Sequence, residues 1–420
     1  MRPQSRRALW GTPAYLRLWS AVAISETGDW LLFIALPLYA LGVSGSALSM
    51  SLVFLAELVP AVVVGTACGP LIDRRGPGRL LAALTAAQAV VLMPLLALGP
   101  GRLWILFAVA ATQAGLTSIT TPAQQALVPS LVSPRDLPSA NALVDMAGNV
   151  ARLAGSPLGG VLLPLVGLRA LVLGDAVSFL LSALLLVGCG PSARRLGGMA
   201  AATAGGWLSA QREAWHCIRH DRGLLSLLAI SLLASVAQGL FLVLFVLFVL
   251  RSLHAGDGVV GLLRGVQAVG GVLGGVVVGA VARRVDPRAL TAGGLAAFGL
   301  VSLLTWNSPA LTTATWWYVA LFVTVGIPST ALVTGLITDV QQSVPAGRLG
   351  RVLSLMQVAQ ALGQGAGIVV AGLLGGQVSL SALLDVQAGC YLACAAIAAV
   401  HLVASRARGA AHAEADPARG

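Results

Sequence analysis

Long apolar runs, interrupted by short polar segments, dominate the pattern of hydrophobic and polar positions along this chain. A helix needs about 20 mainly apolar residues to cross the hydrocarbon core of a bilayer, and twelve runs approach or exceed that length. We expect spans at 18–42, 48–72, 80–99, 103–127, 143–166, 168–190, 223–250, 258–281, 289–307, 314–338, 352–375 and 381–404. Only Gly167 separates the fifth span from the sixth. The pattern predicts an all-α membrane protein with twelve transmembrane helices.

The composition argues against a soluble domain. Of the 420 residues, 57% are hydrophobic and only 10% are charged, whereas a soluble domain carries about 25% charged residues. All 26 basic residues are arginines, and they lie in short clusters between the apolar runs. The formal charge of +11 therefore indicates a membrane protein rather than a nucleic-acid partner, and the lipid bilayer is the expected partner.

The arginines also predict an orientation, because cytoplasmic loops carry an excess of basic residues. If the predicted spans alternate in direction, 21 of the 26 arginines fall on one side of the membrane. Both termini are then cytoplasmic, and the membrane is the inner (cytoplasmic) membrane of a cell. The basic N-terminal segment precedes an apolar run that is too long for a signal peptide, so this run is expected to stay as the first span.

The two halves of the chain repeat each other. Segments 69–78 and 279–288 follow the second and eighth spans, combine Gly, Arg and Pro in the same order, and lie half a chain length apart. Parallel six-helix repeats of this kind occur in secondary transporters. We predict two pseudo-symmetric six-helix halves, 1–190 and 223–405, a cytoplasmic linker, 191–222, and a cytoplasmic tail, 406–420.

Three sets of residues resemble the motifs of a known family. They are Gly69-Pro-Leu-Ile-Asp-Arg-Arg-Gly76 after the second span, Gly155-Ser-Pro-Leu-Gly-Gly160 in the fifth, and Gly28-Asp29 with Pro122-Ala, Leu127-Val-Pro129 and Ala140-Asn-Ala-Leu143. The first resembles the loop 2–3 signature of the major facilitator superfamily, and the second resembles its antiporter motif. The third is similar to its drug, siderophore and macrolide exporter branch. The resemblance implies efflux by antiport, with a link to multidrug resistance.

The resemblance also implies which residues gate the transporter. In the family, the Asp of the loop 2–3 signature meets the N-terminus of the eleventh span, and a helix N-terminus carries roughly half a positive charge. The matching gate residues are Gly69, Asp73, Arg74, Gly76 and, at the eleventh span, Arg351. The antiporter motif places Gly155, Pro157, Gly159 and Gly160 on the fifth span. The fourth span departs from the pattern, since Gln113 stands where proton-coupled members commonly carry Arg.

Ionisable side chains inside spans are costly, so each is a functional candidate. Glu26 and Asp29 share one face of the first span, and Glu57 lies near the middle of the second. Arg152 lies deep in the fifth span and needs a carboxylate partner, for which Asp29, Glu57 and Asp145 are available. The functional interpretation is a protonation switch that couples proton movement to helix movement. The alternative is a static pair that only holds the bundle together.

Other polar groups in the spans support weaker hypotheses. Asp145 and Asp175 lie nearer span ends, where interfacial roles are expected, and Arg264 has either a substrate role or an outward-pointing side chain. Amide side chains in the second half either bind substrate in a cavity or connect helices. These amides are Gln238, Gln267, Gln360 and Gln364.

The sequence favours an exporter of amphipathic small molecules that works by alternating access, most simply by proton antiport. A facilitator or an uptake permease of the same fold is the first alternative; a polytopic membrane enzyme and a sensor without transport are remote ones. No cofactor or metal site is expected. The five cysteines match no zinc-site spacing, and the five histidines are scattered, with no acidic ligand near the i, i+4 pair of His216 and His220. A phosphate-binding loop with its Lys is absent, which excludes direct ATP drive by this chain. We expect a monomer whose ligands are protons and a small-molecule substrate.

Overall fold

The computed structural model describes residues 12–65, 77–99, 101–189, 207–282, 284–344 and 346–415. Helices make up nearly all of these residues, and no strand occurs among them. Within a bilayer, a helix satisfies its own backbone hydrogen bonds without help from water. The predicted all-α fold is confirmed.

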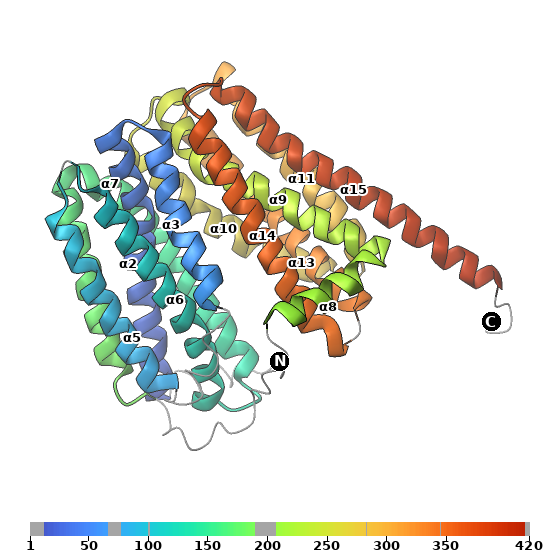
Figure 1. Ribbon diagram of the computed structural model, residues 1–420, viewed down its shortest axis with the longest axis horizontal. Coiled ribbons are helices and arrows are strands. Elements are labelled where there is room, and N and C mark those ends of the chain that lie inside the picture. The colour runs from blue at the N-terminus through green and yellow to red at the C-terminus, as the bar shows by residue number, and fades with distance from the viewer. Residues whose placement is uncertain are drawn as a thin grey trace. The chain divides into compact units, whose positions relative to one another are not determined.

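The first part of the chain, coloured blue to green in Figure 1, forms long helices that pack side by side. They are α2 (Pro13–Ser44), α3 (Ala47–Gly65), α5 (Pro77–Leu92), α6 (Leu103–Leu131) and α7 (Leu137–Leu186). The short 3₁₀ helix η1 (Met93–Ala97) continues α5. Helix α7 packs along α2, and α3 packs along α6.

The 50-residue helix α7 is two spans in one element. At about 1.5 Å per residue it would be roughly 75 Å long, more than twice the hydrocarbon thickness of ~30 Å. Gly167 interrupts it with φ 76° and ψ 164°, values that an L side chain rarely adopts. The predicted boundary between the fifth and sixth spans is therefore confirmed at this glycine.

The second part of the chain is also helical. It comprises α8 (Trp207–Arg219), α9 (Arg222–Leu247), α10 (Asp257–Val281), α11 (Pro287–Asn307), α12 (Thr315–Thr324), α13 (Gly326–Ser343), α14 (Ala346–Leu374) and α15 (Leu380–Ala415). A π-helical turn, η3 (Phe248–Ser252), extends α9, and a 3₁₀ turn, η4 (Ser308–Ala310), extends α11. Helix α8 lies within the predicted linker. Helix α15 continues past its predicted span into the predicted tail, because the Ala- and Arg-rich sequence there favours helix.

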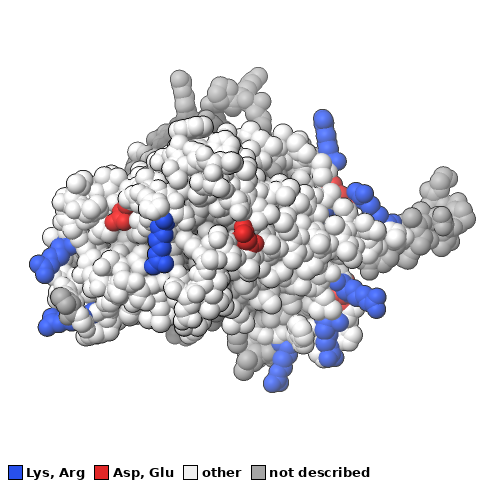
Figure 2. Space-filling model, turned by 90° about the horizontal axis from the view of Figure 1, so that it is seen from above, with Lys and Arg blue, Asp and Glu red and all other residues white. Residues whose placement is uncertain are grey.

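The helices of the described residues account for all twelve predicted spans. Ten helices are long and apolar enough to cross a membrane, with α12 and α13 counted together, and α3 adds a shorter apolar helix. Since α7 supplies two spans, the total is twelve. Figure 2 shows that few acidic or basic side chains interrupt the visible surface. Exposed apolar side chains such as Leu165, Leu184 and Val276 would face lipid.

The chain divides into two compact units. The first, unit 1, comprises Met1–Thr203 and Val249–Ala268, and the second, unit 2, comprises Ala204–Phe248 and Val269–Gly420. The core of unit 1 includes Leu32, Leu36, Leu92, Leu106 and Phe179, and the core of unit 2 includes Ile230, Leu295, Val340, Tyr391 and Cys394. The first twelve residues of α10, as far as Ala268, therefore belong to unit 1.

Candidate functional site

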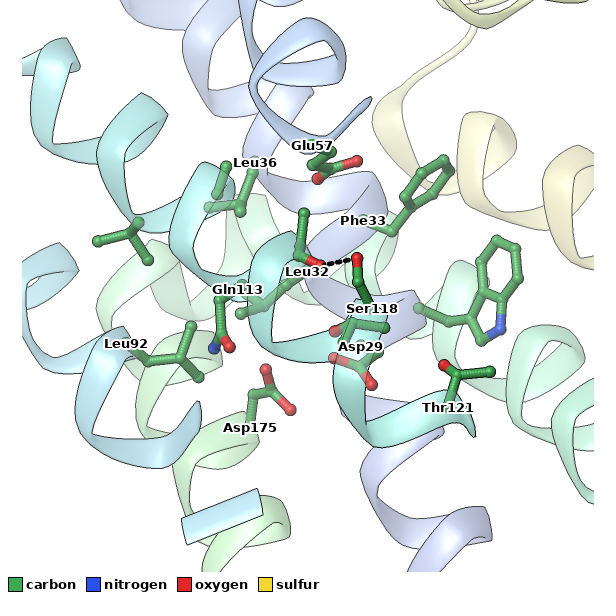
Figure 3. A pocket seen from close by; sticks show the side chains of 15 residues that line it. Asp29, Leu32, Phe33, Leu36, Glu57, Leu92, Gln113, Ser118, Thr121 and Asp175 are labelled. Carbon is green, nitrogen blue, oxygen red and sulfur yellow. Dashed lines mark hydrogen bonds between the residues drawn. The ribbon is translucent and has the colours of Figure 1, made fainter. Parts of the chain in front are cut away.

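A cavity of about 480 Å³ lies among the helices of unit 1. Its polar lining includes three acids and one amide, which Figure 3 shows around the same space: Asp29, Glu57, Gln113 and Asp175. Its apolar walls include Trp30, Phe33, Leu36, Leu92 and Val109. A mainly apolar pocket with a few convergent polar groups is typical of a small-molecule site.

Asp29 is the acid that connects this cavity to a second one. Its side chain lies on α2 in the middle of the bundle, yet it is exposed because it faces the open cavity. A smaller cavity of about 70 Å³ is lined by Asp29, Glu26, Thr117 and Thr121 among others. The structure thus places Glu26 and Asp29 beside one space, as their spacing along α2 predicts. Both stay predictions as proton carriers.

Glu57 approaches the larger cavity from α3. It is half-buried, and neither it nor Asp29 has a hydrogen-bond or ion-pair partner within the part of the chain that the structure describes. A carboxylate without a partner in a low dielectric is costly as an ion, so it takes up a proton or binds a cation. The geometry is therefore compatible with either role.

Asp175 is a site residue that the sequence interpretation misplaced. It was expected near a span end, but its side chain on α7 is only 2% exposed and it lines the cavity. Its Oδ1 accepts a hydrogen bond of 3.0 Å from Ser178 Oγ. The carboxylate packs on the backbone of Gly28, where a Cβ atom would overlap it. The same signal that selects Asp29, an acid within an apolar run, could have selected Asp175.

Arg152 does not form the predicted pair with a carboxylate in this conformation. Its Nη2 donates to the side-chain oxygen Oε1 of Gln267, and its Nε donates to the carbonyl of Arg264 at 3.3 Å. Its guanidinium also lies over the ring of Trp30, 4.9 Å from the centroid. An amide oxygen, a carbonyl and an aromatic face together satisfy the cation without a second ion.

Arg264 belongs to the same network and does not point away from the bundle. Its Nη1 donates to Gln267 Oε1 at 3.2 Å, and its guanidinium lies 5.6 Å from the ring centroid of Phe33. Gln267, predicted as a substrate-cavity residue, therefore accepts from two arginines. Trp30 and Phe33 contact these arginines and also line the cavity.

The predicted antiporter motif brings helix backbones together within unit 1. Cβ atoms at Gly155 and Gly159 would collide with the α2 carbonyls of Thr27 and Leu31, and one at Gly160 would collide with the carbonyl of Asp257. Pro157 of the same motif packs against α10, so closely that Cβ atoms at Gly261 and Gly265 would meet it. The motif is thus a close-packed contact of α7 with α2 and α10. Its link to antiport stays a prediction.

The remaining predicted residues lie elsewhere. Gln360 donates to Ser231 Oγ at 2.9 Å, and Gln238 and Gln364 are half-buried in unit 2, so none of the three lines the cavity of unit 1. Arg351 lies half-buried in the first turns of α14. The other gate residues, Gly69, Asp73, Arg74 and Gly76, lie outside the described residues. The roles of all these residues stay predictions.

Unit 2 holds a buried charged cluster that the sequence interpretation did not identify. Asp339 on α13 is 1% exposed and accepts from Arg288 Nε at 3.1 Å. His401 Nε2 on α15 lies 3.0 Å from Asp339 Oδ2, and Ser343 Oγ donates to Oδ1 at 3.2 Å. The cluster joins α11, α13 and α15. An acid directly after the predicted tenth span and a His in the twelfth were its only sequence signals, because the three residues are far apart along the chain.

No metal centre is assembled within the described ranges. No group of three or more His, Cys, Asp or Glu side chains is positioned there to hold a metal ion. The acids around the cavity instead face a space large enough for an organic ligand. The site is a candidate for binding and for proton exchange.

Twelve spans, together with a cavity in unit 1 that intramembrane acids line, define the class of polytopic membrane transporters. The comparison with protein families agrees, since the model of the Major Facilitator Superfamily matches residues 18–368 and 227–418. The chain belongs to the Major Facilitator Superfamily. Family and fold point to a transporter and not to an enzyme.

A curated relative and several solved structures are similar to the chain. The uncharacterized MFS-type transporter YfiS of Bacillus subtilis (strain 168) is 26% identical over 172 residues, a match that covers 41% of each chain. The nucleoside transporter NupG superposes with a TM-score of 0.72 at 13% identity, covering 92% of this chain and 99% of NupG. An inward-facing bacterial homologue of the iron transporter ferroportin superposes with a TM-score of 0.68 at 18% identity, covering 92% of this chain and 98% of the homologue. These likenesses show the shared fold.

Proposed function

We propose that this chain is a secondary transporter that exports an amphipathic small molecule in exchange for protons by alternating access. The observation that carries the proposal is the cavity of unit 1, in which Asp29 and Glu57 have no described partner and face mainly apolar walls. Apolar walls suit an amphipathic substrate. Carboxylates at this depth suit the exchange of protons.

The proposed exchange requires that proton and substrate compete. A substrate in the cavity contacts Asp29 or Glu57 and favours release of the proton, and a returning proton favours release of the substrate. A ligand shifts a conformational equilibrium only as far as it binds the two states differently. Arg152 supplies that difference if it leaves Gln267 for a carboxylate in the other state of the transporter.

The proposed direction, export, rests on the motif at Gly155, Pro157, Gly159 and Gly160, which resembles the family's antiporter motif. Asp73 and Arg351 would close the cytoplasmic side, as the loop 2–3 signature implies. We further propose the cytoplasmic membrane as the location, with both termini inside, because the arginines concentrate on that side. The transporter works as a monomer in this proposal, with protons and the substrate as its only ligands.

Resistance profiling of a deletion strain and an overexpressing strain against a panel of drugs, antibiotics and siderophores tests this function. Export predicts that the deletion sensitises the cell to some compounds and that overexpression lowers their accumulation, with loss of both effects when a protonophore collapses the gradient. Greater accumulation on overexpression would identify an uptake permease. Efflux that persists without a gradient would identify a facilitator.

A further inference from the structure

We infer that the cavity of unit 1 binds amphipathic organic cations, and in particular ammonium groups that carry N–H donors on an apolar body. This inference rests on the proposed transport function and specifies its substrate class. It follows from the sign of the charge, the shape of the walls and the hydrogen-bonding groups that line the cavity.

The lining, as far as the described residues form it, is acidic and contains no basic side chain. Three of its fifteen described residues are acids, and none is Arg or His. The nearby cations of Arg152 and Arg264 lie outside this lining, where they contact Gln267 and the rings of Trp30 and Phe33. The field in the cavity therefore favours a positive ligand and repels an anion of the same shape.

The walls fit the apolar body of such a ligand. Trp30 and Phe33 contribute aromatic surface, and Leu36, Leu92 and Val109 contribute aliphatic surface. A volume of about 480 Å³ lies within the range of roughly 300–1,000 Å³ that holds drug-sized ligands.

Gln113 provides an independent indication of a donor on the ligand. Its Nε2 donates to the carbonyl of Gln88 at 3.0 Å, which fixes the orientation of the amide. Its Oε1 is buried and has no hydrogen-bond partner in the described structure, although Gln113 lines the cavity. A buried acceptor without a donor is costly, so a ligand N–H would stabilise it.

The cavity also holds acceptors that no described donor satisfies. Gln88 Nε2 donates to Thr117 Oγ1 at 3.2 Å. Ser118 Oγ donates to the carbonyl of Ala114 at 2.8 Å, the bond drawn in Figure 3. Among the acceptors of the lining, Gln113 Oε1 and the carboxylates of Asp29 and Glu57 have no described partner. A protonated amine supplies both the charge and the donors that this set lacks.

Four pyrene probes that differ only at the end of a butyl chain test the inference: a primary ammonium, a trimethylammonium, a hydroxyl and a carboxylate. Binding is measured by pyrene fluorescence on the full chain in phosphatidylcholine nanodiscs, with empty nanodiscs as the blank. We expect the ammonium to bind about tenfold or more tightly than the hydroxyl, as a charge-assisted hydrogen bond implies. The trimethylammonium should lie between them, and the carboxylate should bind most weakly.

Variants then assign the preference to the cavity. Asp29→Asn should reduce ammonium binding to the level of the hydroxyl probe, whose own binding stays unchanged. Gln113→Leu should remove the advantage of the ammonium over the trimethylammonium. Asp145→Asn, at an exposed acid outside the cavity lining, is the matched control and should keep all four affinities.

The affinities of the wild-type protein for the four probes test the inference even if a variant fails to fold. Equal affinities for the ammonium and the hydroxyl, or tightest binding of the carboxylate, would overturn the inference. Binding needs no gradient, so this failure is distinct from that of the proposed function. A chain that binds the ammonium but exports nothing overturns the transport proposal alone, and one that exports only neutral or anionic compounds overturns the cation class alone.

Discussion

The carboxylate of Asp175 on α7 lies directly on the backbone of Gly28 on α2 and occupies the space that a side chain at Gly28 would need. A Cβ atom at Gly28 would overlap Asp175 Oδ1 and would come within 2.8 Å of Ser178 Oγ. Asp175 is only 2% exposed, and the cavity that it lines is the space into which it could move. Gly28 therefore determines where this acid sits in the cavity.

Gly28→Ala is expected to destabilise the protein and to impair transport. Overpacking a buried site costs roughly 1–3 kcal/mol, and the displaced Asp175 would enter the cavity. The measurements are the thermal unfolding midpoint in detergent and efflux at matched expression. Gly42→Ala on the same helix is the control, since a Cβ there meets nothing within 4 Å. Equal midpoints and efflux for the two variants would contradict this packing.

Gln267→Leu is expected to destabilise unit 1, because the acceptor shared by Arg152 and Arg264 is lost. Hydrogen bonds to charged groups contribute roughly 1.5–3 kcal/mol, against about 0.5–1.5 kcal/mol for neutral ones. Gln360→Leu, which removes one neutral bond to Ser231, is the matched control. Unfolding midpoints should therefore fall further for Gln267→Leu, and equal losses would show that other groups hold the arginines.

The fold could be predicted from the sequence because each span is a continuous apolar run, which can be recognised without knowing any contact between distant residues. The length of each apolar run and the break at Gly167 determine where helices begin and end, and both hold in the structure. The acids of the cavity were accessible for the same reason, since an ionisable residue inside an apolar run is visible by itself. Asp29 and Glu57 were selected in this way.

The partners of these residues could not be predicted. Arg152 meets Gln267, 115 residues away, and Asp339 meets His401, 62 residues away. Such contacts depend on how each helix is rotated, and on which neighbour it meets, and no local pattern encodes either. Asp175 shows the same limit, because a count of residues from the span edge gives depth but not the direction of the side chain.

Asp339→Asn is expected to destabilise unit 2. The substitution keeps the volume of the side chain but removes the negative charge that Arg288 and His401 both contact. It also turns the amide N–H group of the new Asn toward an N–H donor of Arg288 or His401. Removing one partner of a buried ion pair costs roughly 3–5 kcal/mol, and the lower end is expected because the Arg288 side chain is 30% exposed.

Asp385→Asn is the control for this prediction. That acid accepts a single exposed hydrogen bond from Asn307 at 3.0 Å, so its loss should change the unfolding midpoint little. If both variants unfold at the wild-type temperature, the Arg288, Asp339 and His401 cluster does not stabilise the packing of α11, α13 and α15.

The arginine distribution predicts that reporters fused at Arg194 and after Arg408 lie in the cytoplasm. A cytoplasmic reporter such as green fluorescent protein should be active at both sites, and alkaline phosphatase, which needs the periplasm, should be inactive. A fusion after Arg102, on the opposite predicted side, is the control and should show the reverse. Strong phosphatase activity at Arg194 or after Arg408 would overturn the proposed orientation.

The coupling prediction concerns Asp29 and Glu57, the two acids of the cavity without a described partner. Asp29 lines both cavities and has Glu26 beside it in the smaller one. Carboxylates this close do not all ionise cheaply in a low dielectric, so at least one is expected to hold a proton near neutral pH. Asn and Gln mimic the protonated, neutral forms at nearly constant volume.

Asp29→Asn should therefore abolish uphill efflux driven by a pH gradient, while downhill equilibration of saturating substrate continues in part. Glu57→Gln should do so instead if Glu57 carries the proton, and Asp145→Asn should behave like wild type. The measurement is flux in proteoliposomes, with and without an imposed gradient, of a compound that the efflux panel identifies. Loss of downhill flux as well would indicate a damaged binding site rather than broken coupling. If both Asp29→Asn and Glu57→Gln keep a full response to the gradient, these acids serve binding or packing alone, and the coupling ion binds at another site.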